Sequence, residues 1–189
     1  MTKFLIAILL IIGYSSVGYT QEKPSPNIPT EVYLREALSF LNAVKNKELG
    51  DPSVTLVDVP KFSCFDYTVN DSTTFTIAEM DQMANEIKSP KIKNWRDILS
   101  PKIRFLQEKY VNTHSRLIKN PKREARLFNK YFGGCYYNFS APIFLRNYTF
   151  CLFYVDKICA AGQSSGELQV FEKKDGLWKQ LPSRCEWSE

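Results

Sequence analysis

The chain has 189 residues, of which 44% are hydrophobic and 24% charged, and its formal net charge is +5. With 14% aromatic residues spread along the chain, this composition excludes an intrinsically disordered protein and is typical of a globular one. The sequence contains no visible internal repeat, and its length without a leader suits a single domain.

Residues 1–20 have the layout of a secretory signal peptide, with a positive charge at Lys3 and an unbroken apolar run over 4–12. Nine apolar residues rise only about 14 Å as a helix, whereas the hydrocarbon core of a bilayer is roughly 30 Å thick. We therefore predict cleavage after Thr20 or Gly18, of which Thr20 is preferred, and export to the periplasm, the cell surface or the medium. An uncleaved membrane anchor is the alternative. Three prolines in 21–29 predict an extended tether before the domain.

The first half of the domain shows helical periodicity. Apolar residues recur at three- and four-residue spacing over 30–47, which predicts an amphipathic helix with Thr30 as its N-cap. Two candidate strands follow, at 54–59 and 62–69. Further along, the Thr-x-x-Glu pattern that begins at Thr76 predicts a capping box and a helix that runs to about Lys88.

Three further segments of this half carry helix signals. Residues 94–99 suit one short helical turn. The pair Ser100-Pro101 is typical of a helix start, and the apolar residues after it predict a helix through Tyr110. The pair Asn120-Pro121 repeats that signal, and the two glycines at 133–134 end the segment.

After Gly134 the pattern changes to strands. Aromatic and β-branched residues predict strands at 136–139, 142–145, 148–155, 168–172 and 177–181. The sequence predicts a tight turn at 146–147, and a hairpin turn at 174–176 in which Gly176 supplies a positive φ.

The strand at 148–155 is apolar on both faces, which predicts a central strand covered on both sides. We therefore predict one α+β domain over residues 30–189. Its helical half spans about 30–134 and packs on an antiparallel β-meander that spans about 135–189.

The C-terminal meander carries a pattern of small, aromatic and turn residues. It consists of Ser140, Pro142, Ile143, Phe144, Tyr154, Val155, Cys159, Gly166, Leu168, Phe171, Lys173, Gly176, Trp178, Lys179, Trp187 and Ser188. This pattern resembles the C-terminal half of a family of small secreted bacterial proteins of unknown function. The resemblance covers about 50 of the 189 residues and implies export and a fold, without an activity. The family loop has a second cysteine where this chain has Gln163, so Cys159 must pair elsewhere or stay free.

Five cysteines in an exported chain predict disulfides, and an odd number allows at most two bridges within one chain. Four of them, Cys135, Cys151, Cys159 and Cys185, lie in the last 55 residues and are the disulfide candidates. We expect Cys64 to be the free thiol. The sequence has a single histidine and no Cys-x-x-Cys pair, so it predicts no metal site.

Charge is concentrated between Lys88 and Lys130, where thirteen basic and three acidic residues give a net charge of +10. One interpretation is a basic helical face, with Lys119, Lys122, Arg123 and Arg126 as anion-binding candidates. Its partners would be anionic polysaccharide or lipid headgroups. The other interpretation is a set of solvated helix surfaces. No aromatic stacking platform accompanies the basic residues, so we do not expect a dedicated nucleic-acid module.

Residues suited to catalysis are few. His114 is the one histidine, and Cys64 with His114 is the only nucleophile–base pair that can be proposed. The loop 159–166 is a candidate anion loop but suits a hairpin connection better, and Trp178 and Trp187 suit sheet cover better than sugar stacking. We predict an exported binding or structural protein without a cofactor; the alternative is a hydrolase or thiol enzyme with an unrecognised site.

Overall fold

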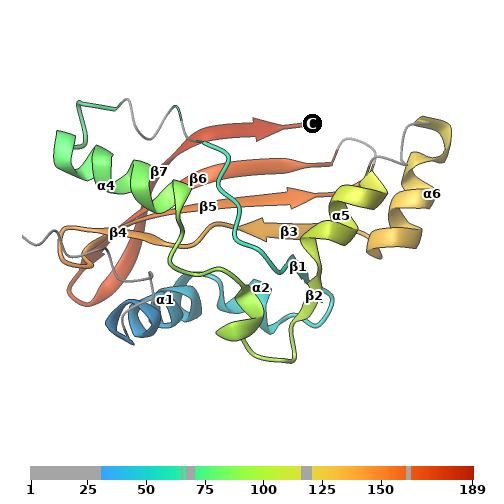
Figure 1. Cartoon of the computed structure of the whole chain (residues 1–189), viewed down its shortest axis with the longest axis horizontal. Helices are drawn as coiled ribbons and strands as arrows, with labels where there is room; N and C mark the ends of the chain where they lie inside the picture. The colour runs from blue at the N-terminus through green and yellow to red at the C-terminus, as the bar shows by residue number, and fades with distance from the viewer. Residues whose placement is uncertain (1–30, 65, 67–70, 116–120, 161–162) are drawn as a thin grey trace, which may run out of the picture.

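A computed structural model describes residues 31–189 except 65, 67–70, 116–120 and 161–162; for 121–124 it describes the backbone alone. It confirms the predicted α+β fold, in which helices come first along the chain and the antiparallel meander comes last (Figure 1). The predicted signal peptide, the tether and the N-cap Thr30 lie outside the described residues.

The helical half begins with two helices and a short strand. These are α1 (Glu31–Val44), α2 (Asn46–Gly50) and β1 (Thr55–Val57). Helix α4 (Ile77–Lys88) begins at the predicted capping box, where Thr76 Oγ1 accepts from the Glu79 amide and the Glu79 carboxylate accepts from the Thr76 amide. A single 3-10 turn, η1 (Trp95–Asp97), occupies the segment predicted as a short helical turn.

The remaining elements complete the sheet and cover one end of it. They are β2 (Arg104–Leu106), α5 (Glu108–Ser115), α6 (Pro121–Phe132), β3 (Tyr136–Phe139), β4 (Ile143–Leu145), β5 (Phe150–Ile158), β6 (Ser165–Lys174) and β7 (Leu177–Ser188). The strand order is β2-β1-β3-β5-β6-β7, and β4 pairs with β5. Strands β3, β5, β6 and β7 are antiparallel neighbours, whereas β1 is parallel to both β2 and β3. The sheet is therefore mixed, because the helical half contributes two strands to it.

Two predictions for the helical half are wrong. The segment after Ser100 does not continue as a helix to Tyr110, because residues 104–106 pair with β1 and helix α5 begins only at Glu108. Residues 62–64 form no strand, and the rest of the candidate strand 62–69 falls almost wholly among the undescribed residues. Residues 104–106 form a strand because they pair with β1, which is far away in the sequence. Local helix-start signals carry no information on such distant partners.

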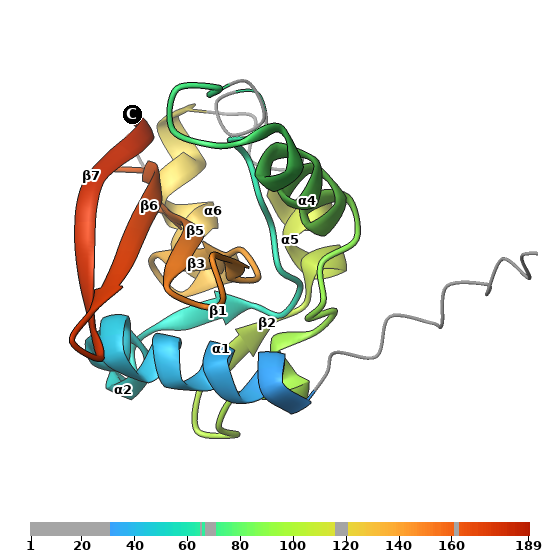
Figure 2. The ribbon, with the colours of Figure 1, turned by 90° about the vertical axis from the view of Figure 1, so that its left-hand side faces the viewer.

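Strand β5 is covered on both faces, as its two apolar faces predicted (Figure 2). On one face, Phe40 of α1 packs edge-to-face on Phe153, with ring centroids 5.5 Å apart. On the other face, Met83 of α4 packs in a cluster with Leu152 and Tyr154. The predicted helical cover thus lies on both sides of the sheet, with α1 and α4 opposite each other.

A third apolar cluster closes the end of the sheet near β2. Phe128 and Phe132 of α6 pack with Val111 of α5 against Leu106 and Tyr136. Burial of this one face of α5 and α6 leaves their other faces to solvent, which is the usual arrangement of an amphipathic surface helix.

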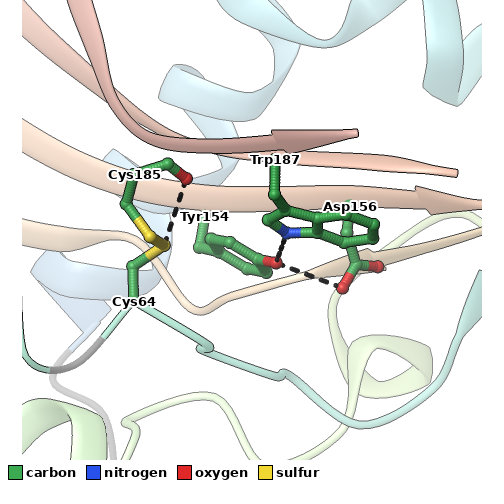
Figure 3. Close-up of a disulfide and its surroundings, with 5 residues drawn as sticks. All are labelled: Cys64, Tyr154, Asp156, Cys185 and Trp187. Carbon is green, nitrogen blue, oxygen red and sulfur yellow. Dashed lines mark hydrogen bonds between the residues drawn. A yellow bond between two sulfur atoms is a disulfide. The ribbon is translucent and has the colours of Figure 1, made fainter. Parts of the chain in front are cut away.

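Two disulfides cross-link the chain, Cys64–Cys185 and Cys135–Cys159. The prediction of Cys64 as the free thiol is wrong, and so is the inclusion of Cys151 among the paired candidates, since Cys151 is a free thiol buried in the core. The segment 58–64 crosses the sheet and ends beside β7, so a residue distant in sequence becomes the neighbour of Cys185 (Figure 3). The partner of Cys159 is one of the three that the sequence left open.

Two disulfides indicate that the protein folds in an oxidising compartment, which means an extracellular or periplasmic one. Within the described ranges, no helix has the length and apolar character needed to span a bilayer.

Candidate functional site

The end of the molecule built by β2, α5 and α6 exposes four basic side chains: Arg104, Lys109, Arg126 and Lys130. None of them has an ion-pair partner among the described residues. Helices α5 and α6, which carry three of the four, lie together at one end of the sheet, at the right of Figure 1. Solvent-exposed, unpaired cations on neighbouring elements keep their charge available to an anion.

The predicted anion-binding residues fall at this same end only in part. Arg126 is exposed on α6, which carries Phe128 and Phe132 on its buried face. Lys122 and Arg123 belong to the first turn of α6, where the structure describes only the backbone, and Lys119 lies outside the described residues. The structure therefore places one of the four side chains.

The N-terminal part of the basic segment is used within the fold. Lys91 forms an ion pair with Glu86 at 2.8 Å, and Arg96 forms one with Asp58 at 3.3 Å. These bases already have acidic partners, so the segment of net charge +10 does not present all of its charge to solvent.

The proposed Cys64/His114 pair is ruled out as a nucleophile–base dyad. Cys64 is bonded to Cys185 and so has no thiol. His114 stacks on Tyr110 with ring centroids 3.8 Å apart, and its Nδ1 lies 2.9 Å from the Tyr110 carbonyl oxygen. These contacts give the histidine a packing role on α5.

A largely buried polar network lies beside the Cys64–Cys185 bridge (Figure 3). Asn138 Nδ2 donates to Asp156 Oδ1 at 2.6 Å, and the Tyr154 hydroxyl donates to Asp156 Oδ2 at 3.4 Å. Trp187 Nε1 donates to the same hydroxyl at 2.9 Å. The chain of donors runs from the indole through the phenol to the carboxylate, so each polar group has a partner.

Burial raises the pKa of Asp156 and of two tyrosines near it, Tyr154 in the network and Tyr136 outside it. Desolvation raises the pKa of Asp156, although Asn138 and the charge of Lys61 act in the opposite direction. Burial also raises the pKa of Tyr154, and burial together with the Asp156 charge raises the pKa of Tyr136 to about 12. A carboxyl with a raised pKa is a common feature of catalytic sites, but no described cavity is lined by Asp156.

The loop between β5 and β6 and the tryptophans have structural contacts. Ser164 Oγ accepts from the Cys159 amide at 3.0 Å and donates to the Cys159 carbonyl, which ties the hairpin connection together. Trp178 packs edge-to-face on Phe40 at 5.2 Å, as expected for sheet cover. Trp187 packs so closely on β6 that a Cβ at Gly166 would lie 2.4 Å from its Nε1.

An open cleft of about 710 Å³ lies on the α1 face of the sheet, beyond the end of that helix. Its lining includes Lys45 and Glu48 from the α1–α2 junction, Tyr137 of β3, and Glu167 and Gln169 of β6. Sequence reasoning missed these residues, because they belong to three segments that are far apart in the chain and form no motif. The one signal available was the change from apolar to charged residues along this face of β5.

No family model, no curated protein and no solved structure matches the chain. Within the described residues, no group of three or more His, Cys, Asp or Glu side chains is placed to hold a metal ion.

Proposed function

We propose that this is an exported, non-enzymatic binding protein that uses the end formed by β2, α5 and α6 to bind anionic polymers. The observation that carries the proposal is the exposure of Arg104, Lys109, Arg126 and Lys130 without acidic partners among the described residues. The partner class is an acidic polysaccharide or a surface of anionic lipid headgroups, since both present repeated negative charges.

The local sequence supports this proposal. Residues 100–134 contain nine Lys or Arg and two Glu, whereas the remainder of the chain carries excess acid. Charges are screened beyond about 8 Å at physiological ionic strength, so a local excess matters more than the net charge of the whole protein. Several cations on adjacent elements suit a polyanion, which engages many of them at once.

Export is the second part of the proposal. The signal-peptide layout of residues 1–20 and the two disulfides both support a protein outside the cytoplasm, in the periplasm, at the cell surface or secreted. Membership of the secreted bacterial family stays a prediction that rests on the C-terminal residue pattern. The hydrolase or thiol-enzyme alternative gains no support from the described residues, because its one proposed nucleophile is in a disulfide.

Charge reversal tests the basic end directly. The variant Lys109→Glu/Arg126→Glu/Lys130→Glu should lose salt-sensitive retention on heparin and cosedimentation with phosphatidylglycerol vesicles, with affinity at least about tenfold lower. Comparison of the two probes shows whether polysaccharide or lipid is the better partner.

The matched control reverses three exposed lysines elsewhere, Lys88→Glu/Lys93→Glu/Lys179→Glu, and changes the net charge by the same amount. It should retain most of the binding. If both triple variants lose binding equally, the protein responds to net charge and the basic end is not a site. If neither loses binding, the proposal is wrong.

A further inference from the structure

The open cleft arises because α1 does not cover the full length of the sheet. On the α1 face of β5, Cys151 and Phe153 are buried beneath the helix. Further along the same face, Val155 is half-buried and Lys157 is exposed. Helix α1 ends at Val44, and α2 is a helix of five residues that forms the cleft wall with Lys45 and Glu48. The cleft floor is therefore part of the sheet that none of the described helices covers.

Two polar side chains in the lining are more than nine-tenths buried. Lys45 is 7% exposed, and the one ion-pair partner of its ammonium among the described residues is Glu48, at 3.5 Å. Gln169 is 6% exposed; its Nε2 donates to Glu167, but its Oε1 has no hydrogen-bond partner within the described part of the chain. Buried acceptors and ammonium groups normally have their partners, so this pair has hydrogen-bonding capacity to spare.

The charges of the lining nearly balance. They are two lysines, Lys45 and Lys157, and three glutamates, Glu48, Glu167 and Glu186. Glu167 already accepts from Ser183 and Gln169, so its charge is dispersed over two hydrogen bonds. A strongly anionic ligand would be repelled by the glutamates, and a strongly cationic one by the lysines. Hydroxyl groups both donate and accept hydrogen bonds, so they can pair with the ammonium, carboxylate and amide groups of the lining.

The floor also offers apolar surface beside the polar groups. Tyr137 and Val155 are half-buried neighbours on it, and the Lys157 ammonium lies 5.9 Å from the Tyr137 ring centroid. A sugar ring has one apolar face and a rim of hydroxyls, which matches an aromatic ring surrounded by amide, carboxylate and ammonium groups. The volume of about 710 Å³ lies within the usual range for small-ligand sites.

We propose that this cleft binds a neutral oligosaccharide. On binding, the Gln169 amide turns toward the cleft, so that its Oε1, which is closed to solvent in the free protein, accepts from one sugar hydroxyl. The Lys45 ammonium donates to another hydroxyl, and Tyr137 packs on the ring. The lining of the cleft contains none of the four basic residues of the β2, α5 and α6 end, so this site does not depend on the anion-binding proposal.

Backbone-amide NMR titrations of the oxidised protein test the site with three neutral probes, maltotetraose, cellotetraose and triacetylchitotriose. At least one should give saturable shift changes at Tyr137, Lys157 and Gln169, with a dissociation constant below about 10 mM, and none at α5 or α6. Trialanine serves as a zwitterionic probe that is not a saccharide. If none of the saccharides shifts these amides, or if trialanine alone does, the oligosaccharide proposal is overturned.

Substitution of Gln169 separates a binding role from a structural one. Gln169→Leu should weaken saccharide binding about tenfold or more, because a sugar hydroxyl loses its acceptor in a buried site. The melting temperature should change little, since the variant loses the Nε2 hydrogen bond to Glu167 but also removes a buried acceptor that has no partner among the described residues. The matched control is Gln107→Leu at an exposed glutamine outside the cleft, which should bind like the parent. Unchanged binding in Gln169→Leu, or lost binding with a lower melting temperature, would contradict the assignment.

Discussion

At the scale of single residues, the most unusual group is the carboxyl of Asp156, which is 2% exposed and holds Asn138 and Tyr154 by hydrogen bonds. Desolvation raises its pKa in the folded protein. The folded state therefore binds its proton more tightly than the unfolded chain does, and ionisation of this group opposes folding. Its destabilising effect is absent below the unfolded pKa of about 3.9 and is complete above the folded pKa.

This argument predicts the pH dependence of Asp156→Asn. Asparagine keeps an acceptor for Asn138 and cannot ionise, so the variant should gain stability relative to the parent as the pH rises from about 4 to about 7. Urea unfolding at both pH values measures the difference. The exposed acid Asp97, replaced in the same way, is the control for removal of one carboxyl group. A constant difference in stability between Asp156→Asn and the parent across this range would mean that the pKa of Asp156 is not raised.

At the scale of elements, one residue of the loop after β1 organises three segments. Asp58 Oδ1 accepts from the Glu108 amide at 3.0 Å at the start of α5, and Asp58 Oδ2 accepts from Arg96. The backbone of Asp58 also donates to Leu106 and accepts from Trp95. The N-terminus of α5 is thus capped by a residue 50 positions away, which explains why local signals placed this helix too early.

Removal of this cap should destabilise the protein locally and globally. We expect Asp58→Ala to lower the free energy of unfolding by about 2 kcal/mol, because the α5 amide loses its acceptor and Arg96 loses its partner. Hydrogen exchange should accelerate at the amides of α5. Asp58→Asn keeps the capping acceptor and should lose less stability; equal losses in the two variants would assign the effect to charge alone.

At the scale of the whole molecule, the two disulfides differ in the length of chain that they close. Cys64–Cys185 spans 121 residues and joins the helical half to the last strand, whereas Cys135–Cys159 spans 24 residues within the β3–β5 region. In the chain-entropy model, a longer loop restricts the unfolded state more, which gives about 5 kcal/mol for the first bridge and about 3 kcal/mol for the second.

Denaturant unfolding of the paired alanine variants tests this order. Cys64→Ala/Cys185→Ala should lose more stability than Cys135→Ala/Cys159→Ala. Cys151→Ala is the control, because it replaces a cysteine that forms no disulfide. Reducing agent should not change the difference in the free energy of unfolding between this variant and the parent. If the short bridge proves the more important, native-state packing around it outweighs the entropy of the unfolded chain.

The sequence by itself determined the secondary structure of the meander, the α4 capping box and the burial of both faces of β5. These features depend on residues within a few positions of one another, such as Thr76 with Glu79, or on the alternation within one strand. It also located an excess of basic residues, although only Arg126 of the four candidates has a described side chain.

Only the tertiary structure decided the disulfide pairing, the conversion of 104–106 into strand β2, and the cleft beside Lys45 and Gln169. Each of these joins segments that are far apart in sequence, so its energy depends on which surfaces meet after the chain collapses. The periodicity of one segment shows which of its faces can be buried. It does not show which distant segment covers that face, or whether the face stays open to a ligand.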